Sequence, residues 1–169
     1  IFNDKKNFEV LIPVMKYFDD HMLVLAGNHQ TPYGDKVKGL IDKYQLQDRI
    51  VLTGQIREEE KYWLYAHTEA LLFPSLAEGF GLPVIEAMSQ GKPTFLSTQT
   101  SLPEIGGDLA YYFESFEEEA MSQLIKEKLN EFYKNEEELK IKLKSRAAFF
   151  GWDNCLNSYL DYYKEIISS

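Results

Sequence analysis

Two glutamates and two glycines in one short segment have the clearest chemical potential in this chain. The segment over 73–90 reads FPSLAEGFGLPVIEAMSQ and contains Gly79 and Gly81 in a loop directly before a helical pattern that starts at Pro83. Proline suits a first helical turn because its missing N–H is not needed there. Backbone N–H groups of a glycine-containing loop at a helix N-terminus form an anion site that suits a phosphate or diphosphate.

Glu78 and Glu86 flank this loop. Glu86 lies only about one turn inside the helix, ~6 Å along its axis, so both carboxylates can border one cleft. Glu86 also points away from the core, because the apolar residues of the helix share another arc: Val84, Ile85, Ala87 and Met88. Carboxylates accept hydrogen bonds from sugar hydroxyls, so the set suits a nucleotide diphosphate sugar. On motif specificity alone, a glycine-rich turn followed by a solvated glutamate is an equal alternative.

The composition is that of one acidic, folded domain. The chain has 169 residues, with 44% hydrophobic and 14% aromatic residues, which excludes a disordered tail. Its 18 Lys plus Arg against 27 Asp plus Glu give a net charge of −9, which argues against nucleic acid as a partner. The single cysteine, Cys155, has no internal partner, and no apolar run reaches ~20 residues. We therefore expect a cytoplasmic protein.

Apolar patterns predict alternating strands and helices that must position these residues. Strands are expected over 22–26, 50–52, 70–73, 94–97 and 110–113, and helices over 7–17, 35–44, 58–67 and 83–90. From Glu117 onward the chain reads as helical, with a break at Gly151. Repeated β–α units with continuous apolar strands indicate an α/β fold, a parallel sheet with helices on both faces. Ligands of such sheets bind beyond the carboxyl ends of the strands.

The segment EGFGLPVIEAMSQGKP closely resembles the Glu-x7-Glu motif of retaining glycosyltransferases of the GT-B fold, in the large group-1 family (family 4). Further segments resemble the family in the expected order. They are Asp4-Lys5-Lys6-Asn7, Leu25-Ala26-Gly27, Val51-Leu52-Thr53-Gly54-Gln55-Ile56, Phe73-Pro74-Ser75, Ser101-Leu102-Pro103-Glu104-Ile105 and Phe150-Gly151-Trp152. The resemblance covers nearly the whole chain.

The resemblance implies the Rossmann-like C-terminal half of a GT-B enzyme. The chain over 1–169 is then one nucleotide-sugar-binding domain with a final helix over 152–167, while the acceptor-binding N-terminal domain and the first strand lie outside it. The family usually has an arginine a few residues before the Lys6 position, and none stands between Ile1 and Asp4. We therefore expect the isolated chain to bind its donor weakly and to be inactive.

The resemblance also implies roles for single residues. Glu78 would lie near the transferred sugar, and Lys6 would offset the charge of the leaving diphosphate; these are the two catalytic candidates. Glu86 would hold the ribose hydroxyls, and we expect both Glu86 and Lys6 to face solvent. The other donor-binding candidates are Gly79, Phe80, Gly81 and Leu82 for the sugar and diphosphate, and Gln55 and Ile56 for the base.

The implied function is transfer of a sugar, with retained anomeric configuration, from a nucleotide diphosphate sugar to a sugar or lipid-linked acceptor. We expect a hexosyltransferase of cell-envelope polysaccharide or glycolipid synthesis that needs no metal and no other cofactor. The full-length protein would lie in the cytoplasm or at the inner face of the membrane. Two alternatives stay open, namely half of a GT-B nucleotide-sugar epimerase and a non-catalytic nucleotide-binding module.

The remaining conspicuous residues have structural explanations at this stage. The three histidines show no metal-ligand spacing, so we expect no metal site. We expect a buried thiol at Cys155. The aromatic pairs Tyr62-Trp63 and Tyr162-Tyr163 are interpreted as packing rather than a sugar platform. The stretch over 152–167 carries an apolar stripe, which predicts that the isolated domain either folds this helix onto its own surface or self-associates.

Overall fold

A computed structural model describes residues 1–168, and Ser169 lies outside the described residues. The strands are β1 Leu23–Ala26, β2 Ile50–Gly54, β3 Leu71–Phe73, β4 Thr94–Ser97 and β5 Tyr111–Phe113. The α-helices are α1 Leu11–Val14, α2 Pro32–Tyr44, α3 Glu58–His67, α4 Leu82–Ser89, α5 Leu102–Gly106, α6 Glu118–Lys134, α7 Glu136–Phe149 and α8 Trp152–Ser168. Short 3-10 helices are η1 Asp4–Lys6, η2 Phe8–Val10, η3 Met15–Tyr17 and η4 Gly107–Leu109.

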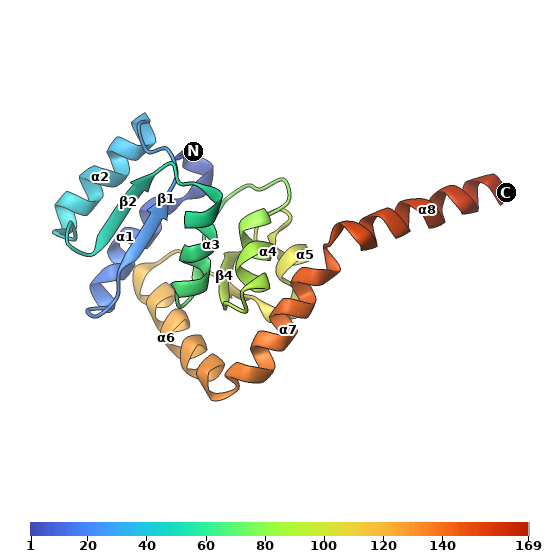
Figure 1. Cartoon of the computed structure of the whole chain (residues 1–169). Coiled ribbons are helices and arrows are strands. Elements are labelled where there is room, and N and C mark those ends of the chain that lie inside the picture. The colour runs from blue at the N-terminus through green and yellow to red at the C-terminus, as the bar shows by residue number, and fades with distance from the viewer. Residues whose placement is uncertain (169) are drawn as a thin grey trace.

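The strands pair in parallel, as the β–α alternation predicts. β1 pairs with β2, and β4 lies between β3 and β5. Within residues 1–168 no strand pairing joins the two ladders, although the sequence predicts one sheet. The apolar core bridges them instead, because Phe95 of β4 and Phe113 of β5 pack in one cluster with Leu23 and Leu25 of β1. The fold is therefore the expected α/β class with a divided sheet (Figure 1).

Helices pack on both ladders, and α4 from the middle of the chain lies against α7 from its C-terminal part. α1 packs on α2 and α6, while α4 packs on α3, α5 and α7. On α4 the residues Val84, Ala87 and Met88 are fully buried, which confirms the predicted apolar arc of this helix. A second core cluster forms around them and includes Phe73, Leu96 and Leu102. The N-terminal end of α4 is thereby fixed beside the carboxyl ends of β3 and β4.

Several predicted elements differ in detail from the observed ones. The expected helix over 7–17 consists of η2, α1 and η3 in succession, and Pro13 within α1 lacks the backbone donor of a regular helix. α2 begins earlier than predicted, because the Thr31 hydroxyl accepts a hydrogen bond from the Gly34 amide at 3.0 Å and caps the helix. The short helix α5 was not expected, and the C-terminal helical stretch has an additional break at Asn135.

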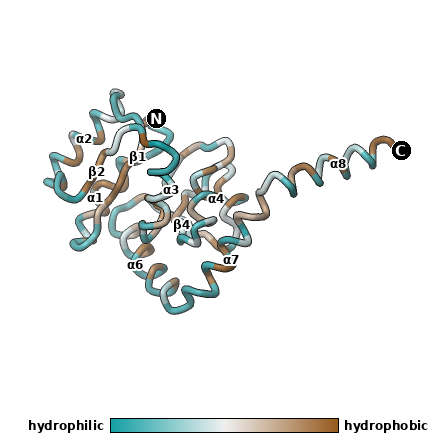
Figure 2. The backbone as a smooth tube through the Cα atoms, viewed as in Figure 1, coloured by the Kyte–Doolittle hydropathy of each residue, from teal (hydrophilic) through white to brown (hydrophobic). Residues whose placement is uncertain are grey.

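α8 projects away from the rest of the molecule (Figure 1). Apolar and polar segments alternate along it (Figure 2), and every residue over 152–167 is exposed. Cys155 is therefore exposed, not buried as predicted, and Tyr162 and Tyr163 do not pack in a core. Among residues 1–168, no helix has the length and apolar character needed to cross a membrane.

Tyr62 and Trp63 of α3 also lie on the surface, contrary to the packing interpretation. Tyr62 and Trp63 are 49% and 59% exposed, and α3 has no fully buried residue. The Trp63 ring stacks on the imidazole of His67 in the next turn, with the ring centroids 4.2 Å apart. Trp63 thus packs on His67 of the same helix rather than in the core.

Candidate functional site

The loop between β3 and α4 has a conformation that requires glycine at its end. Gly81 is the N-cap residue of α4 and has φ +106° and ψ +40°. A Cβ at this position would lie 3.2 Å from Leu102 Cδ2 in addition to the backbone strain. Leu82 and Pro83 then begin the helix, as the proline position predicts. The glycine lets the chain turn sharply from the strand end into the helix.

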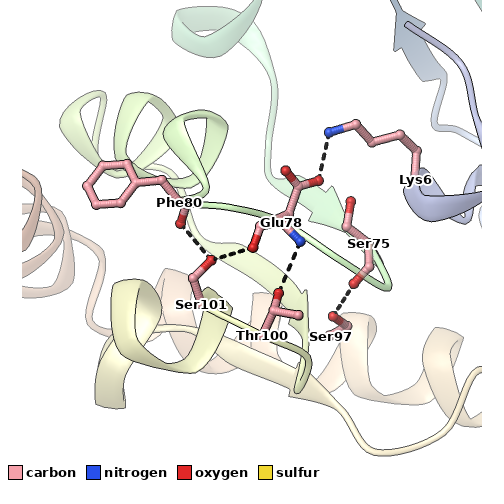
Figure 3. A network of polar contacts seen from close by, with 7 residues as sticks. All are labelled: Lys6, Ser75, Glu78, Phe80, Ser97, Thr100 and Ser101. Atoms are coloured by element: carbon pink, nitrogen blue, oxygen red, sulfur yellow. Dashed lines mark hydrogen bonds and ion pairs between the residues drawn. The ribbon is translucent and has the colours of Figure 1, made fainter.

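Two residues that precede α5 hold this loop in place (Figure 3). The Glu78 amide donates to Thr100 Oγ1 at 3.0 Å. The Ser101 hydroxyl lies 3.0 Å from the Phe80 carbonyl oxygen and 3.2 Å from that of Glu78, and it donates to them. Within the described part of the chain, the amides of Gly79, Phe80 and Gly81 donate to no other protein atom. The loop is therefore held through the Glu78 amide and through the carbonyls of Glu78 and Phe80. The three amides without a protein acceptor among the described residues belong to the exposed Gly79 and Phe80 and to the buried Gly81.

Lys6 and Glu78, the two catalytic candidates, are in direct contact. Lys6 Nζ lies 2.6 Å from Glu78 Oε1, and their side chains are only 25% and 13% exposed. The expectation that Lys6 faces solvent is therefore wrong, because the carboxylate covers its ammonium group. The Lys6 ammonium also lies 5.2 Å from the centroid of the Phe73 ring, which places it over the end of β3.

The neighbours of Lys6 tie the N-terminal segment to the same loop. The Leu76 amide donates to the Lys5 carbonyl oxygen at 2.7 Å. The buried Asn7 side chain donates to the Pro74 carbonyl oxygen at 3.2 Å, and Asn7 has the left-handed φ of +53°. These contacts join segments far apart in the sequence, so they hold the backbone on both sides of Lys6 against the loop.

Glu86 faces α3 and not open solvent, which corrects the second exposure expectation. Its Oε1 lies 2.7 Å from Lys61 Nζ, and its Oε2 accepts a hydrogen bond from the Tyr65 hydroxyl at 3.1 Å. The Glu86 side chain is 21% exposed. Because α3 packs against α4, the carboxylate lies between the two helices with both oxygens engaged.

The other donor-binding candidates lie around the loop and at the start of α3. Phe80 and Leu82 are exposed, and the Phe80 ring contacts Phe150 edge-on, with the centroids 6.0 Å apart. Gln55 is exposed and Ile56 half-buried in the segment between β2 and α3. In the described residues, no hydrogen bond or ion pair connects Gln55 or Ile56 with Lys6 or Glu86. The structure thus gathers most of the candidates at one end of the strands. That Gln55 and Ile56 belong to the same site stays a prediction.

The sequence did not single out the residues that hold Glu86 and the loop. Lys61 and Tyr65 stand one helical turn apart on the predicted helix over 58–67, so they share a face. Nothing in that pattern says that this face meets Glu86, since the contact depends on how α3 packs on α4. Thr100 and Ser101 follow the end of a strand. Thr100 has a left-handed φ of +52°, and nothing in its residue type predicts that conformation.

The two residues that contact Glu86 have shifted pKa values with identifiable causes. Burial raises the pKa of the Tyr65 hydroxyl, and the negative charge of Glu86 raises it further, so the hydroxyl is a permanent donor at neutral pH. Burial lowers the pKa of Lys61, but its hydrogen bonds with Glu58 and Glu86 outweigh this and raise the pKa overall. Among the described residues, no group of three or more His, Cys, Asp or Glu side chains is placed to hold a metal ion.

Comparison with known proteins places the chain in a family. The family model described as glycosyl transferases group 1 matches residues 2–148. The O-antigen chain mannosyltransferase B of Escherichia coli is 34% identical over 142 residues, which are 84% of this chain and 37% of that protein. A serotype-specific mannosyltransferase WbdA of Escherichia coli is 29% identical over an alignment of 173 positions, which covers 98% of this chain and 21% of that protein. The chain thus spans well under half the length of these relatives.

Solved structures share the fold at low sequence identity. Sucrose-phosphate synthase from Thermosynechococcus elongatus superimposes with a TM-score of 0.80 at 23% identity, covering 98% of this chain and 43% of that one. Anabaena HepE in complex with UDP and glucose superimposes with a TM-score of 0.76 at 15% identity, covering 97% of this chain and 46% of that one. The family match and this fold lead to one conclusion: the chain belongs to the group 1 glycosyltransferases and has the Rossmann-like α/β fold of a GT-B C-terminal domain.

Proposed function

We propose that this chain is the donor-binding half of a retaining glycosyltransferase that takes its sugar from a nucleotide diphosphate sugar. The observation that carries the proposal is the Lys6–Glu78 pair, whose carboxylate belongs to the loop in which the amides of Gly79, Phe80 and Gly81 have no acceptor among the described residues. A cation, a carboxylate and free N–H groups at a helix N-terminus match the charges of a sugar bound to a diphosphate.

In this proposal, different residues bind different parts of the donor. The amides of Gly79, Phe80 and Gly81, together with Lys6, bind the diphosphate. Glu78 accepts hydrogen bonds from hydroxyls of the transferred sugar. Its carboxylate contacts the Lys6 ammonium, so it lies next to the diphosphate to which the sugar is attached. The remaining donor-binding positions are Leu82 beside the diphosphate, Glu86 at the ribose, and Gln55 and Ile56 at the base.

The reaction breaks the bond between the anomeric carbon and the diphosphate oxygen. The acceptor hydroxyl forms the new bond on the same face of the sugar, and its proton passes to the leaving diphosphate, so the configuration is kept. Negative charge develops on that diphosphate, where Lys6 and the loop amides stabilise it. The protein therefore supplies a preorganised positive field, and we propose that neither a metal ion nor another cofactor is needed.

The names of the relatives suggest the sugar and the acceptor. The two compared Escherichia coli proteins are mannosyltransferases, one of them named for the O-antigen chain. We therefore propose a mannosyl donor and a sugar or lipid-linked acceptor of envelope polysaccharide synthesis. The acceptor would be bound by an N-terminal domain outside residues 1–169, and the full-length protein would act in the cytoplasm or at the inner membrane face.

Thermal stabilisation by donors tests the proposal. UDP, GDP, ADP and their hexose conjugates are added to the chain, because a ligand that binds only the folded state stabilises it by RT ln(1 + [L]/Kd). We expect the melting temperature to rise with at least one nucleotide diphosphate and to stay unchanged with the matching nucleoside. Equal effects of nucleoside and diphosphate, or no rise with any of them at millimolar concentration, would overturn the diphosphate site.

A further inference from the structure

The carboxylate of Glu86 is held from both sides by one neighbouring helix. Lys61 Nζ contacts Oε1 at 2.7 Å and the Tyr65 hydroxyl donates to Oε2 at 3.1 Å, and both residues belong to α3. Lys61 is itself fixed, since its ammonium group lies 2.8 Å from Glu58 Oε2. The carboxylate therefore has one orientation imposed by two donors and cannot turn without losing a hydrogen bond.

These donors do not use up the capacity of the carboxylate. An ionised carboxylate has about four acceptor positions, two on each oxygen. Lys61 and Tyr65 take one on each oxygen, so one acceptor position on each oxygen is left. The Glu86 side chain keeps 21% of its surface exposed, so it is not sealed off between the two helices.

Two acceptor positions side by side match two neighbouring hydroxyls of a ribose. We propose that Tyr65 and Lys61 are positioning residues that orient Glu86 to accept hydrogen bonds from both the 2′- and the 3′-hydroxyl of the bound nucleotide. This inference rests on the proposed function, in which Glu86 binds the ribose. It adds a role for two residues of α3 that do not touch the nucleotide themselves.

The two donors are suited to hold the carboxylate through a binding cycle. Tyr65 is half-buried on α3, and its hydroxyl donates to Glu86 on α4. Like any tyrosine, Tyr65 keeps its proton at neutral pH, and its raised pKa extends this to more alkaline pH, so the hydroxyl donates to Glu86 and does not repel it. Without the Tyr65 hydroxyl, Oε2 loses its protein partner, and the carboxylate is held only by its ion pair with Lys61 and can rotate. The carboxylate would then lose its fixed orientation, so we expect lower affinity only for ligands that carry the two hydroxyls.

The test compares nucleotides with and without these hydroxyls. Calorimetry measures the affinity of UDP against 2′,3′-dideoxy-UDP, and of GDP against 2′,3′-dideoxy-GDP, for the wild-type chain and its variants. Charge-assisted hydrogen bonds predict that the wild-type chain binds the ribose form about tenfold or more tightly than the dideoxy form. Glu86→Ala is expected to abolish this preference. Tyr65→Phe and Lys61→Met are each expected to reduce it by about threefold or more.

A second tyrosine provides the matched control. The Tyr112 hydroxyl donates to the Gly107 carbonyl oxygen at 2.8 Å, so Tyr112→Phe also removes one partly buried hydrogen bond. This variant is expected to keep the full ribose preference, which separates a loss of orientation from a general loss of stability. If Tyr65→Phe fails to fold, as judged by circular dichroism, Lys61→Met carries the test.

The outcomes separate the inference from the proposed function. If Glu86→Ala abolishes the ribose preference while Tyr65→Phe and Lys61→Met keep it in full, the positioning role is wrong and the ribose site stands. If the wild-type chain shows no preference, or binds none of the four nucleotides, the ribose role of Glu86 is wrong and the inference falls with it. A preference reduced in both α3 variants and kept in Tyr112→Phe supports the inference.

Discussion

The ammonium of Lys6 and the carboxylate of Glu78 form an ion pair of 2.6 Å across two segments far apart in the sequence. The Lys6 ammonium is thus neutralised by the carboxylate beside it. In the proposed site, a diphosphate would share Lys6 with Glu78, and the loop amides would contact its other oxygens. The proposal therefore predicts that donor binding depends on both the cation and the loop, and each can be tested separately.

Lys6→Met is expected to weaken diphosphate binding by about tenfold or more, since a charge-assisted hydrogen bond of ~1.5–3 kcal/mol is lost. Lys5→Met provides the matched control, because it removes the same charge from the neighbouring, exposed position. Calorimetry with UDP and GDP measures both variants. Equal affinities of Lys6→Met and Lys5→Met would show that Lys6 does not bind the diphosphate.

Removing Lys6 also leaves Glu78 without its partner at 13% exposure. The double variant Lys6→Met/Glu78→Gln takes away that uncompensated charge, so we expect it to be at least as stable as Lys6→Met alone. Urea denaturation measures the difference. A double variant less stable than Lys6→Met would mean that Glu78 is stabilised by other contacts of the loop.

Nucleotide diphosphates are expected to bind without a divalent metal, because Lys6 and the open amides supply the positive field. Affinity measured by calorimetry is expected to be the same in EDTA and in Mg²⁺. The chain without nucleotide, titrated with Mg²⁺ alone, is the control for metal binding elsewhere. Loss of binding in EDTA that Mg²⁺ restores would contradict the proposed charge balance.

Gly81→Ala is expected to lower the free energy of unfolding by roughly 1–3 kcal/mol, the cost of a strained backbone conformation. The reasons are its φ of +106° and the 3.2 Å approach of an added Cβ to Leu102. Gly79→Ala is the control, since an added Cβ there meets nothing within 4 Å. Urea denaturation is expected to separate the two variants, and equal stabilities would show that the loop relaxes around residue 81.

The sequence predicted those parts of the fold that depend on local pattern. The bounds of α3 and β4 agree with the predicted ranges, because apolar periodicity and strand length are local properties. The family resemblance placed Lys6 and Glu78 in one site, and the structure joins them directly. What the sequence missed depends on packing between distant segments. The contacts of Glu86 with Lys61 and Tyr65 need the crossing of α3 and α4, which no periodicity specifies.

The prediction of a buried Cys155 failed for a related reason. It rested on the general tendency of free cysteines to be buried, whereas α8 extends into solvent and its thiol is exposed. The packing interpretation of Tyr162 and Tyr163 is wrong because both residues lie on the same exposed helix. Amphipathic periodicity shows that a helix has an apolar face, but it does not say what packs against that face.

The exposed α8 leads to the last prediction, that the chain on its own self-associates. The structure shows the helix projecting rather than folded onto the domain, which favours the second of the two outcomes expected from the sequence (Figure 1). Exposed apolar patches larger than a few hundred Å² mark interaction sites, so two copies are expected to pair through these faces. The apolar face consists of Trp152, Leu156, Tyr159, Leu160, Tyr163 and Ile167.

Sedimentation velocity across a range of concentrations measures this association. Leu156→Asp places a charge in the apolar face and is expected to shift the chain toward the monomer, because burying an unpaired charge is costly. Ser158→Asp adds the same charge on the opposite, polar side of α8 and is expected to leave the association unchanged. A wild-type chain that is monomeric at all concentrations would contradict the prediction, and so would equal effects of the two substitutions, since only one of them lies in the face that is expected to be buried.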